Sequence, residues 1–128
     1  AGDLQIVDKV AKKLVYKNKL ALARTHLYGA HFRVGSQKSA ERVFNSVYSA
    51  AKAIKLPTQR SKVFLALSEK ACELGDISRA LRAMYSVAVV RDKVEALVLI
   101  AVWQRKKRVK LTSKDKLLLQ KLLIQIGK

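Results

Sequence analysis

Hydrophobic residues recur at intervals of three and four positions along most of this chain, and this spacing predicts amphipathic helices. The first is expected between Leu4 and Leu14, where lysines fill the other face. A second is expected over about residues 20–34, ending at Gly35, and a third has its apolar line over residues 40–54. Alternating strand patterns and Asn-Gly or Asp-Gly hairpin turns do not occur, so the pattern predicts no sheet.

Isolated helix-breaking and capping residues divide the middle of the chain. Pro57 marks a turn, and Thr58 is expected to act as the N-cap of a fourth helix. Gly75 suits the position after the end of that helix, and Asp76 suits the N-cap of a fifth helix that reaches Ala88. Because the chain has one proline and five glycines in 128 residues, long helices are favoured.

The sixth expected helix is apolar nearly all round. It follows a short break at Arg91-Asp92, with Asp92 as its cap, and residues 94–103 place hydrophobic side chains on most sides. A helix of this kind is expected to have neighbours on several sides. A last helix, starting at Thr112 or Ser113, is rich in leucine and isoleucine.

Two stretches of the chain, residues 35–47 and 75–87, align without gaps at an offset of forty. They share a glycine, an alanine five positions on, a bulky residue nine positions on, and a small or β-branched residue twelve positions on. The glycine allows the chain to leave a helix with positive φ. The alanine lets paired helices approach closely, and the bulky residue fills the space between them. The pattern therefore predicts antiparallel helix pairs.

This pattern resembles the second helix of the tetratricopeptide repeat, which Gly-Asp opens. The matching residues are Gly75, Asp76, Ala80 and Met84 in one copy, and Gly35, Ala40 and Phe44 in the other. The chain departs from that family in its offset of forty, against about 34, and in lacking the Trp-Leu-Gly signature of the first helix and the usual proline. The resemblance implies one all-α domain, residues 1–128, with about six or seven antiparallel helices stacked as a tetratricopeptide-like or HEAT-like α-α repeat bundle.

Basic residues are in large excess and unevenly placed. The chain has 27 Lys and Arg against 9 Asp and Glu, a formal net charge of +18. Thirteen basic residues and one acid, Glu41, lie between Lys9 and Lys62, and nine basic residues and one acid, Asp115, follow residue 95. Such an excess opposes compaction, because like charges repel, and it indicates a polyanionic partner.

We expect this partner to be RNA or DNA, in duplex or structured form, bound through its phosphate backbone. Lysines outnumber arginines 18 to 9, and lysine suits point contacts to phosphate better than bidentate reading of bases. The predicted nucleic-acid-binding residues form two groups that are expected to make one surface: Lys12, Lys13, Lys17, Arg24, Arg33, Lys38 and Arg42, together with Arg105, Lys106, Lys107 and Arg108.

Aromatic residues are scarce, at 6% of the chain, which gives base stacking little support. Three of them, Phe44, Phe64 and Trp103, fit apolar lines and are expected in the core. Exposed stacking platforms would have to come from the others: Tyr16, Tyr28, Phe32, Tyr48 and Tyr85.

Catalytic, cofactor and metal signatures do not occur, so we expect a non-catalytic protein without a cofactor. His26 and His31 are five residues apart and diverge by about 140° on a helix, which does not suit a shared metal. Glu69 and Glu73 are more typical of solvated or paired carboxylates than of an acid–base dyad. The single cysteine, Cys72, is expected to be buried or half-buried.

Two other functions remain open at this stage. The chain is a candidate protein-interaction adaptor, in which a concave helical face docks an acidic peptide, or a subunit of a larger nucleoprotein or viral assembly. The apolar last helix favours association with a protein or with a second copy of the chain. Alternatively, the basic face binds anionic membranes. The sequence has no apolar run of 18 residues, so we expect no transmembrane segment, and without a visible secretory signal we expect a cytoplasmic location.

Overall fold

The computed structural model describes residues 19–127 of the chain, and within that range every regular element is an α-helix. Residues 19–33 form the described part of a helix that we call the first helix. Five more follow it: α2 (Gln37–Lys52), α3 (Pro57–Glu73), α4 (Ile77–Tyr85), α5 (Val90–Lys107) and α6 (Ser113–Gly127). The prediction of an all-α fold is confirmed for these residues, with six helices, whereas the helix expected between Leu4 and Leu14 lies outside the described range.

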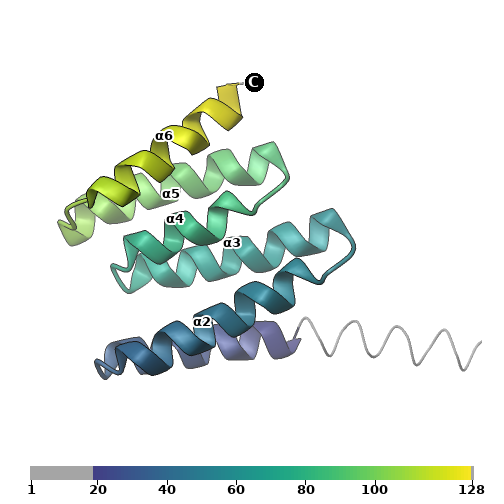
Figure 1. Cartoon of the computed structure of the whole chain (residues 1–128), viewed down its shortest axis with the longest axis vertical. Coiled ribbons are helices and arrows are strands. Elements are labelled where there is room, and N and C mark those ends of the chain that lie inside the picture. Colours follow the sequence, from purple (N-terminus) through teal and green to yellow (C-terminus); the bar gives the residue numbers. More distant parts are fainter. Residues whose placement is uncertain (1–18, 128) are drawn as a thin grey trace, which may run out of the picture.

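Successive helices lie side by side in antiparallel pairs (Figure 1). The first helix pairs with α2, α3 with α4, and α5 with α6, and α3 is central because it packs against α2, α4 and α5. The turns within the three pairs, near residues 35, 75 and 108, all lie at one edge of the stack. The first, third and fifth helices therefore end at the same edge, and the second, fourth and sixth begin there.

All three of these turns have the same backbone structure. Gly35, Gly75 and Arg108 have positive φ angles of 78°, 77° and 55°. The N–H of the residue that follows each of them donates to the carbonyl five positions earlier, at 3.0, 2.8 and 3.2 Å. This is the hydrogen bond of a Schellman motif, which satisfies a carbonyl that the helix end leaves without a partner. Gly35 and Gly75 thus end helices, as their position in the sequence predicted.

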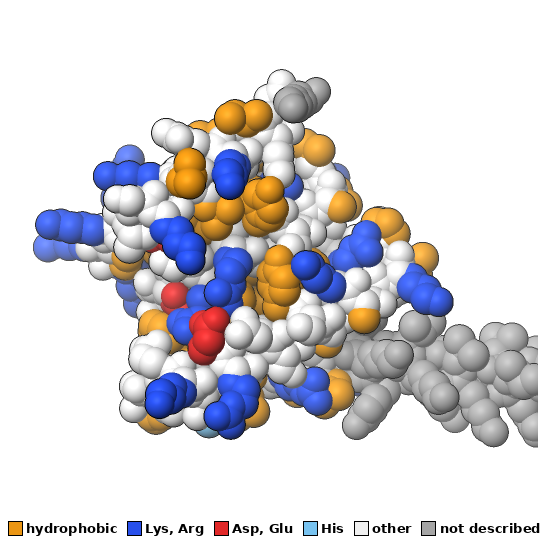
Figure 2. All heavy atoms as spheres, viewed as in Figure 1, with side chains coloured by type: hydrophobic (Ala, Val, Ile, Leu, Met, Phe, Trp, Pro, Cys, Tyr) orange, Lys and Arg blue, Asp and Glu red, His pale blue; other side chains and the backbone are white. Residues whose placement is uncertain are grey.

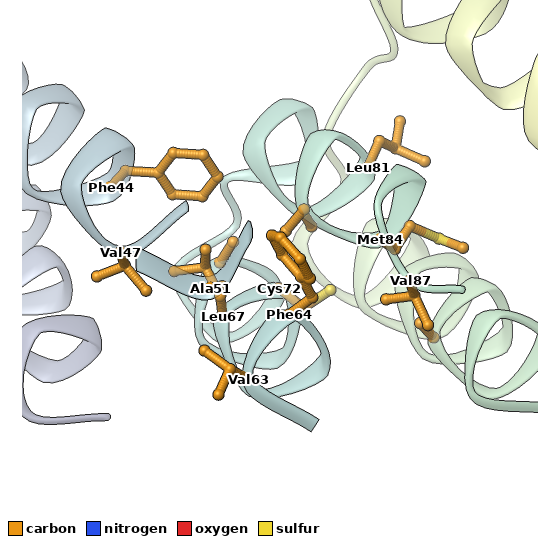
Figure 3. Close-up of a cluster of buried hydrophobic side chains, with 14 of the residues drawn as sticks. Phe44, Val47, Ala51, Val63, Phe64, Leu67, Cys72, Leu81, Met84 and Val87 are labelled. Carbon is orange, nitrogen blue, oxygen red and sulfur yellow. The ribbon is translucent and has the colours of Figure 1, made fainter. Parts of the chain in front are cut away.

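The two similar stretches of sequence bury the same positions. Their shared small and bulky residues are fully buried in both copies: Ala40, Phe44 and Val47, and Ala80, Met84 and Val87. Figure 3 shows several of them in one continuous core with Phe64 and Leu67 of α3. Because burying one large apolar side chain contributes about 1.5–3 kcal/mol, this shared core is the main stabilising feature of the stack.

Two of the three aromatic residues expected in the core are fully buried. Phe44 and Phe64 are inaccessible to solvent, whereas Trp103 is half-buried and packs against the core from outside. The ring of Tyr48 contacts the rings of both phenylalanines. Its centroid is 6.3 Å from that of Phe44 and 5.1 Å from that of Phe64. These contacts join α2 to α3.

Three expected helix boundaries are wrong by a few residues. α3 begins at Pro57 with Leu56 as its N-cap, so Thr58 lies inside the first turn, because proline is well suited to the first helical position. α4 ends at Tyr85 and not at Ala88. The break before α5 accordingly covers residues 86–89, and Asp92 lies in the first turn of α5 and does not cap it.

Tertiary contacts explain why α4 stops early. The hydroxyl of Ser86 hydrogen-bonds the hydroxyl of Tyr48 in α2. Three residues later, the N–H of Val89 donates to Oγ of Ser61 in α3, at 3.4 Å. Both contacts hold the connection in a non-helical path, and neither partner is near in sequence.

The expectation that residues 94–103 have neighbours on several sides is confirmed, since α3, α4 and α6 all pack against α5, but one side of α5 stays exposed. Ala96 and Ile100 of α5 are buried, but Val94, Val98 and Val102 are 41%, 60% and 56% exposed. The neighbours of α5, namely α3, α4 and α6, leave that side uncovered. An apolar sequence all round the helix does not by itself specify which side receives a partner.

Candidate nucleic-acid interface

Two acidic residues, the buried Asp76 and the partly exposed Glu41, link the helix pairs. Asp76, at the start of α4, accepts a hydrogen bond from the hydroxyl of Tyr28 in the first helix, at 2.7 Å, and another from Nη1 of Arg79, also at 2.7 Å. Burial and the Asp76 carboxylate raise the pKa of the Tyr28 hydroxyl above its ordinary range. Arg79 also donates through Nε to Glu41 of α2, at 2.8 Å. Asp76 and Glu41 are therefore both engaged by the fold.

Glu41 joins α2 to α4 through two arginines. Besides Arg79, it accepts a hydrogen bond from Nη2 of Arg82 at 3.1 Å, and the same nitrogen donates to Oδ1 of Asn45 at 2.9 Å. The Arg82 guanidinium also lies over the Phe44 ring, 4.6 Å from its centroid. Burial raises the pKa of Glu41, but the hydrogen bonds from Arg79 and Arg82 outweigh it, and the net effect is a lowered pKa.

Asp115 serves the fold in a similar way at the start of α6. Its carboxylate accepts hydrogen bonds from Oγ of Ser78, at 2.8 Å, and from the N–H of Thr112, at 3.2 Å. In return the N–H of Asp115 donates to Oγ1 of Thr112 at 3.1 Å. This reciprocal pattern is a capping box, and it supports the expected helix start at Thr112 or Ser113.

The acidic residues left at the surface gather on the side of α3 and α5. Within residues 19–127 the exposed acids are Glu69, Glu73 and Glu95. Burial raises the pKa of Glu69 most, and the nearby charges of Glu95 and Glu73 raise it further, which shows that the three are close together. One of them, Glu73, pairs with Lys70 at 3.4 Å.

Among charged side chains, lysine and arginine dominate the rest of the described surface. Those exposed to solvent are Lys19, Arg33, Lys38, Arg42, Lys52, Lys55, Lys62, Arg91, Arg105, Lys106, Lys107, Arg108, Lys110, Lys114, Lys116 and Lys121. Figure 2 shows the face formed by α2, α4 and α6, where Lys and Arg are spread widely and acidic side chains are few. Much of the positive charge of the described residues is thus presented to solvent, while three of their seven acids, Glu41, Asp76 and Asp115, are held in contacts between helices.

The first predicted group of binding residues is only partly assembled as expected. Lys12, Lys13 and Lys17 lie outside the described residues. Arg24 is half-buried, and its Nη1 donates to Oγ of Ser46 in α2 at 3.2 Å, so it contributes to helix pairing. Arg33, at the end of the first helix, and Lys38 and Arg42 of α2 are exposed.

The second predicted group lies at the end of α5 and is exposed throughout. The ammonium groups of Lys106 and Lys107 lie 4.8 and 5.7 Å from the ring centroid of Trp103, close enough for cation–π contact. Arg105 lies beside an apolar hollow that also includes Val98. Lys107 and Arg108 lie at the third turn.

Parts of the two groups lie at the same edge of the stack, one at its first turn and the other at its third turn (Figure 1). We define the turn edge by its exposed basic residues at the first and third turns: Arg33, Lys38, Lys107, Arg108, Lys110 and Lys114. The second turn, at Gly75, lies between them. Lys110 and Lys114 were left out of the predicted site, although their position on either side of an expected helix start was a usable signal.

A hollow of about 380 Å³ opens between α2, α4 and α6. Its lining includes Arg79, Arg82 and Lys114, but also Glu41, Asp76 and Asp115. The acids match the cations in this hollow, so the excess of positive charge lies around it and not inside it.

Aromatic side chains contribute little to this surface. Tyr28 is fully buried, and Phe32 and Tyr48 are half-buried. Tyr85 is 39% exposed, and Tyr16 lies outside the described residues. Few stacking platforms are therefore available to bases.

The histidines and the cysteine of the described residues do not come together in one site. His26 is exposed and His31 half-buried, and residues 19–127 contain no group of three or more His, Cys, Asp or Glu side chains that could hold a metal ion. Burial, with smaller effects from Glu69 and Glu73, raises the pKa of Cys72 to about 12, so this thiol is a core residue. In the same range no helix is long and apolar enough to cross a membrane.

No protein-family model, curated protein or solved structure matches this chain. Function is therefore argued from the arrangement of charge and exposed surface on these helices.

Proposed function

We propose that this protein binds the phosphate backbone of RNA or DNA, without catalysis, through the turn edge and the adjoining face of α2 and α6. The single observation that carries the proposal is the separation of charge. The exposed acids of the described chain lie close together on α3 and α5, with Glu73 near the second turn, whereas the first and third turns carry exposed lysine and arginine. Clusters of cations at the first and third turns attract the phosphates of a nucleic acid, which then releases its counterions. The exposed carboxylate between them, Glu73 at the second turn, is paired with Lys70 at 3.4 Å.

The form of the helices suits this mode of binding. We infer that the three helix pairs are copies of one α-α repeat of the tetratricopeptide-like or HEAT-like kind. The inference is supported by the shared turn structure at residues 35, 75 and 108 and by the matched buried positions of α2 and α4. Stacked repeats give an extended edge, and phosphate contacts at such an edge position the nucleic acid without reading its bases.

Charge reversal at the turn edge tests the proposal. The triple variant Arg33→Glu, Lys38→Glu, Lys107→Glu removes three exposed cations from the first and third turns. We expect it to bind duplex RNA or DNA at least about tenfold more weakly, equally for all sequences, and to reduce the dependence of log Kd on log salt by about three. Binding is measured by fluorescence anisotropy with labelled 20-base-pair duplexes, a length of about two helical turns.

A matched control carries the same change in net charge elsewhere. Lys52→Glu, Lys55→Glu, Lys62→Glu alters exposed residues at the end of α2 and the start of α3, at the opposite edge of the stack. This control should bind clearly more tightly than the turn-edge variant. Equal losses in the two variants would mean that only net charge matters, and would overturn the assignment of the turn edge.

A further inference from the structure

One side of α5 is exposed to solvent. At the equivalent positions of the first helix and of α3, the same side is covered. Counting back from the positive-φ residue of each turn, the positions fourteen and ten residues earlier are Ala21 and Thr25 in the first helix, Ser61 and Leu65 in α3, and Val94 and Val98 in α5. Ala21, Thr25 and Ser61 are at most 4% exposed and Leu65 is half-buried, whereas Val94 and Val98 are 41% and 60% exposed.

Two further positions follow the same rule. Seven residues before the turn, Tyr28 and Ser68 are buried, whereas Ala101 is exposed. Three residues before it, Cys72 is fully buried, whereas the corresponding residue of α5 is the exposed Arg105. We call Val94, Val98, Ala101 and Arg105 the open face.

In the earlier pairs the cover comes from elements that follow along the chain. Tyr28 is hydrogen-bonded to Asp76 at the start of α4, and Ser61 accepts the N–H of Val89 at the start of α5. α5 itself packs along α3. The open face is therefore the continuation of an interface that the protein already uses twice.

The shape and charge of the open face indicate which kind of partner it binds. A hollow of about 480 Å³ is lined by Val98, Ala101, Val102, Arg105 and Lys106. It is thus apolar along α5 and basic where α5 ends. α3 and α5 both end at the turn edge, so they run in the same direction. A helix that packs on α5 in the way that α5 packs on α3 would run in that direction too. The last turn of such a helix would lie beside Arg105 and Lys106.

We propose that the open face binds an amphipathic helix of another protein, with small apolar residues along one stripe and acidic residues in its last turn. This docking site is separate from nucleic-acid binding and does not rest on it. A second copy of this chain is a poorer occupant. Antiparallel pairing of two α5 helices centred on Val98 would place Arg91 against Arg105, and each chain carries a net charge of +18.

A designed peptide tests the proposal. The probe is a labelled helical peptide of 18 residues with alanine and leucine along one stripe, glutamine elsewhere, and three glutamates in its last turn; its partner probe has three lysines there. We expect the acidic probe to bind at least about tenfold more tightly than the basic one. Val98→Asp should weaken binding of the acidic probe at least about tenfold, because a buried valine contact is lost.

Two further variants test whether the acidic probe binds specifically to the open face. Val34→Asp makes the same change at a residue that is 78% exposed and lies in the first turn, and it should leave binding of the acidic probe within about twofold of the unmodified protein. Arg105→Glu leaves one negative charge and one positive charge, that of Lys106, beside the hollow, and should remove most of the preference for the acidic probe. Equal binding of both probes, equal effects of Val98→Asp and Val34→Asp, or a dimer in sedimentation that Val98→Asp dissociates would each overturn the proposal.

Discussion

Tyr28 and Asp76 form a buried polar contact between the first helix and the start of α4, and Arg79 extends it to Glu41 of α2. Residues distant in sequence are thereby held together where the helix pairs meet. Each acid in this network is satisfied by hydrogen bonds, so its burial costs little compared with an unpaired charge.

The hydroxyl of Tyr28 should contribute measurably to stability. Tyr28→Phe removes one hydrogen bond to a charged acceptor and leaves the ring in place, so we expect the free energy of unfolding to fall by about 1.5–3 kcal/mol. Urea denaturation measures the change. The control Tyr85→Phe, at a side chain that is 39% exposed, should stay within about 0.5 kcal/mol of the unmodified protein, and equal losses would contradict the account.

Glu41 should make stability depend on pH in the acid range. Because Arg79 and Arg82 lower its pKa in the folded protein, its contribution is fully present above the ordinary pKa of glutamate, about 4.3, and is lost as the pH falls through the lowered value. The stability difference between the unmodified protein and Glu41→Gln should therefore shrink below about pH 4. A difference that stays constant from pH 7 to the acid range would contradict this role.

At the scale of elements, the sequence predicted the helices well wherever local signals were strong. Gly35 and Gly75 end helices through positive φ, and the apolar line predicted over residues 40–54 contains all the buried residues of α2. The prediction failed where distant contacts decide. α4 ends early because of Tyr48 and Ser61, and the uncovered side of α5 depends on which helices surround it.

Substitutions at two of the three turns should change the free energy of unfolding in opposite directions. Gly75→Ala places a Cβ at φ 77°, and we expect it to lower the free energy of unfolding by about 1 kcal/mol, although the added atom would meet Lys107 and Val109 at an ordinary 3.8 Å. Arg108→Gly relieves the same strain at φ 55° and should raise stability by about as much. Chemical denaturation of both variants tests this, and a destabilised Arg108→Gly would contradict the shared turn structure.

At the scale of the whole molecule, the sequence predicted the excess of positive charge but not its arrangement. The run Arg105 to Arg108 is split between the turn edge and the open face, and Arg24 is turned inward to Ser46. Linear sequence reveals where basic residues are dense. It does not reveal which helix ends share an edge, or that Glu41, Asp76 and Asp115 serve contacts within the fold.

The net charge of the chain should also be visible in its thermal stability. Repulsion between exposed cations opposes folding, and added salt screens it. We expect the Tm to rise as KCl is increased from about 20 to about 500 mM, over which the screening length falls to a few ångströms. A Tm that falls across this range would mean that attractive ion pairs, such as Arg79 with Glu41, outweigh the repulsion.

The central claim is that the turn edge binds nucleic-acid phosphates, and a salt titration tests it most directly. Binding is measured for duplex DNA, duplex RNA and single-stranded RNA of equal length. The account predicts that log Kd rises with log salt with a slope of at least about 5, as for six or more phosphate contacts, and that binding persists near physiological salt with a preference for one duplex form. Weak binding that is equal for all three and vanishes near 150 mM salt, about the physiological ionic strength, would contradict it.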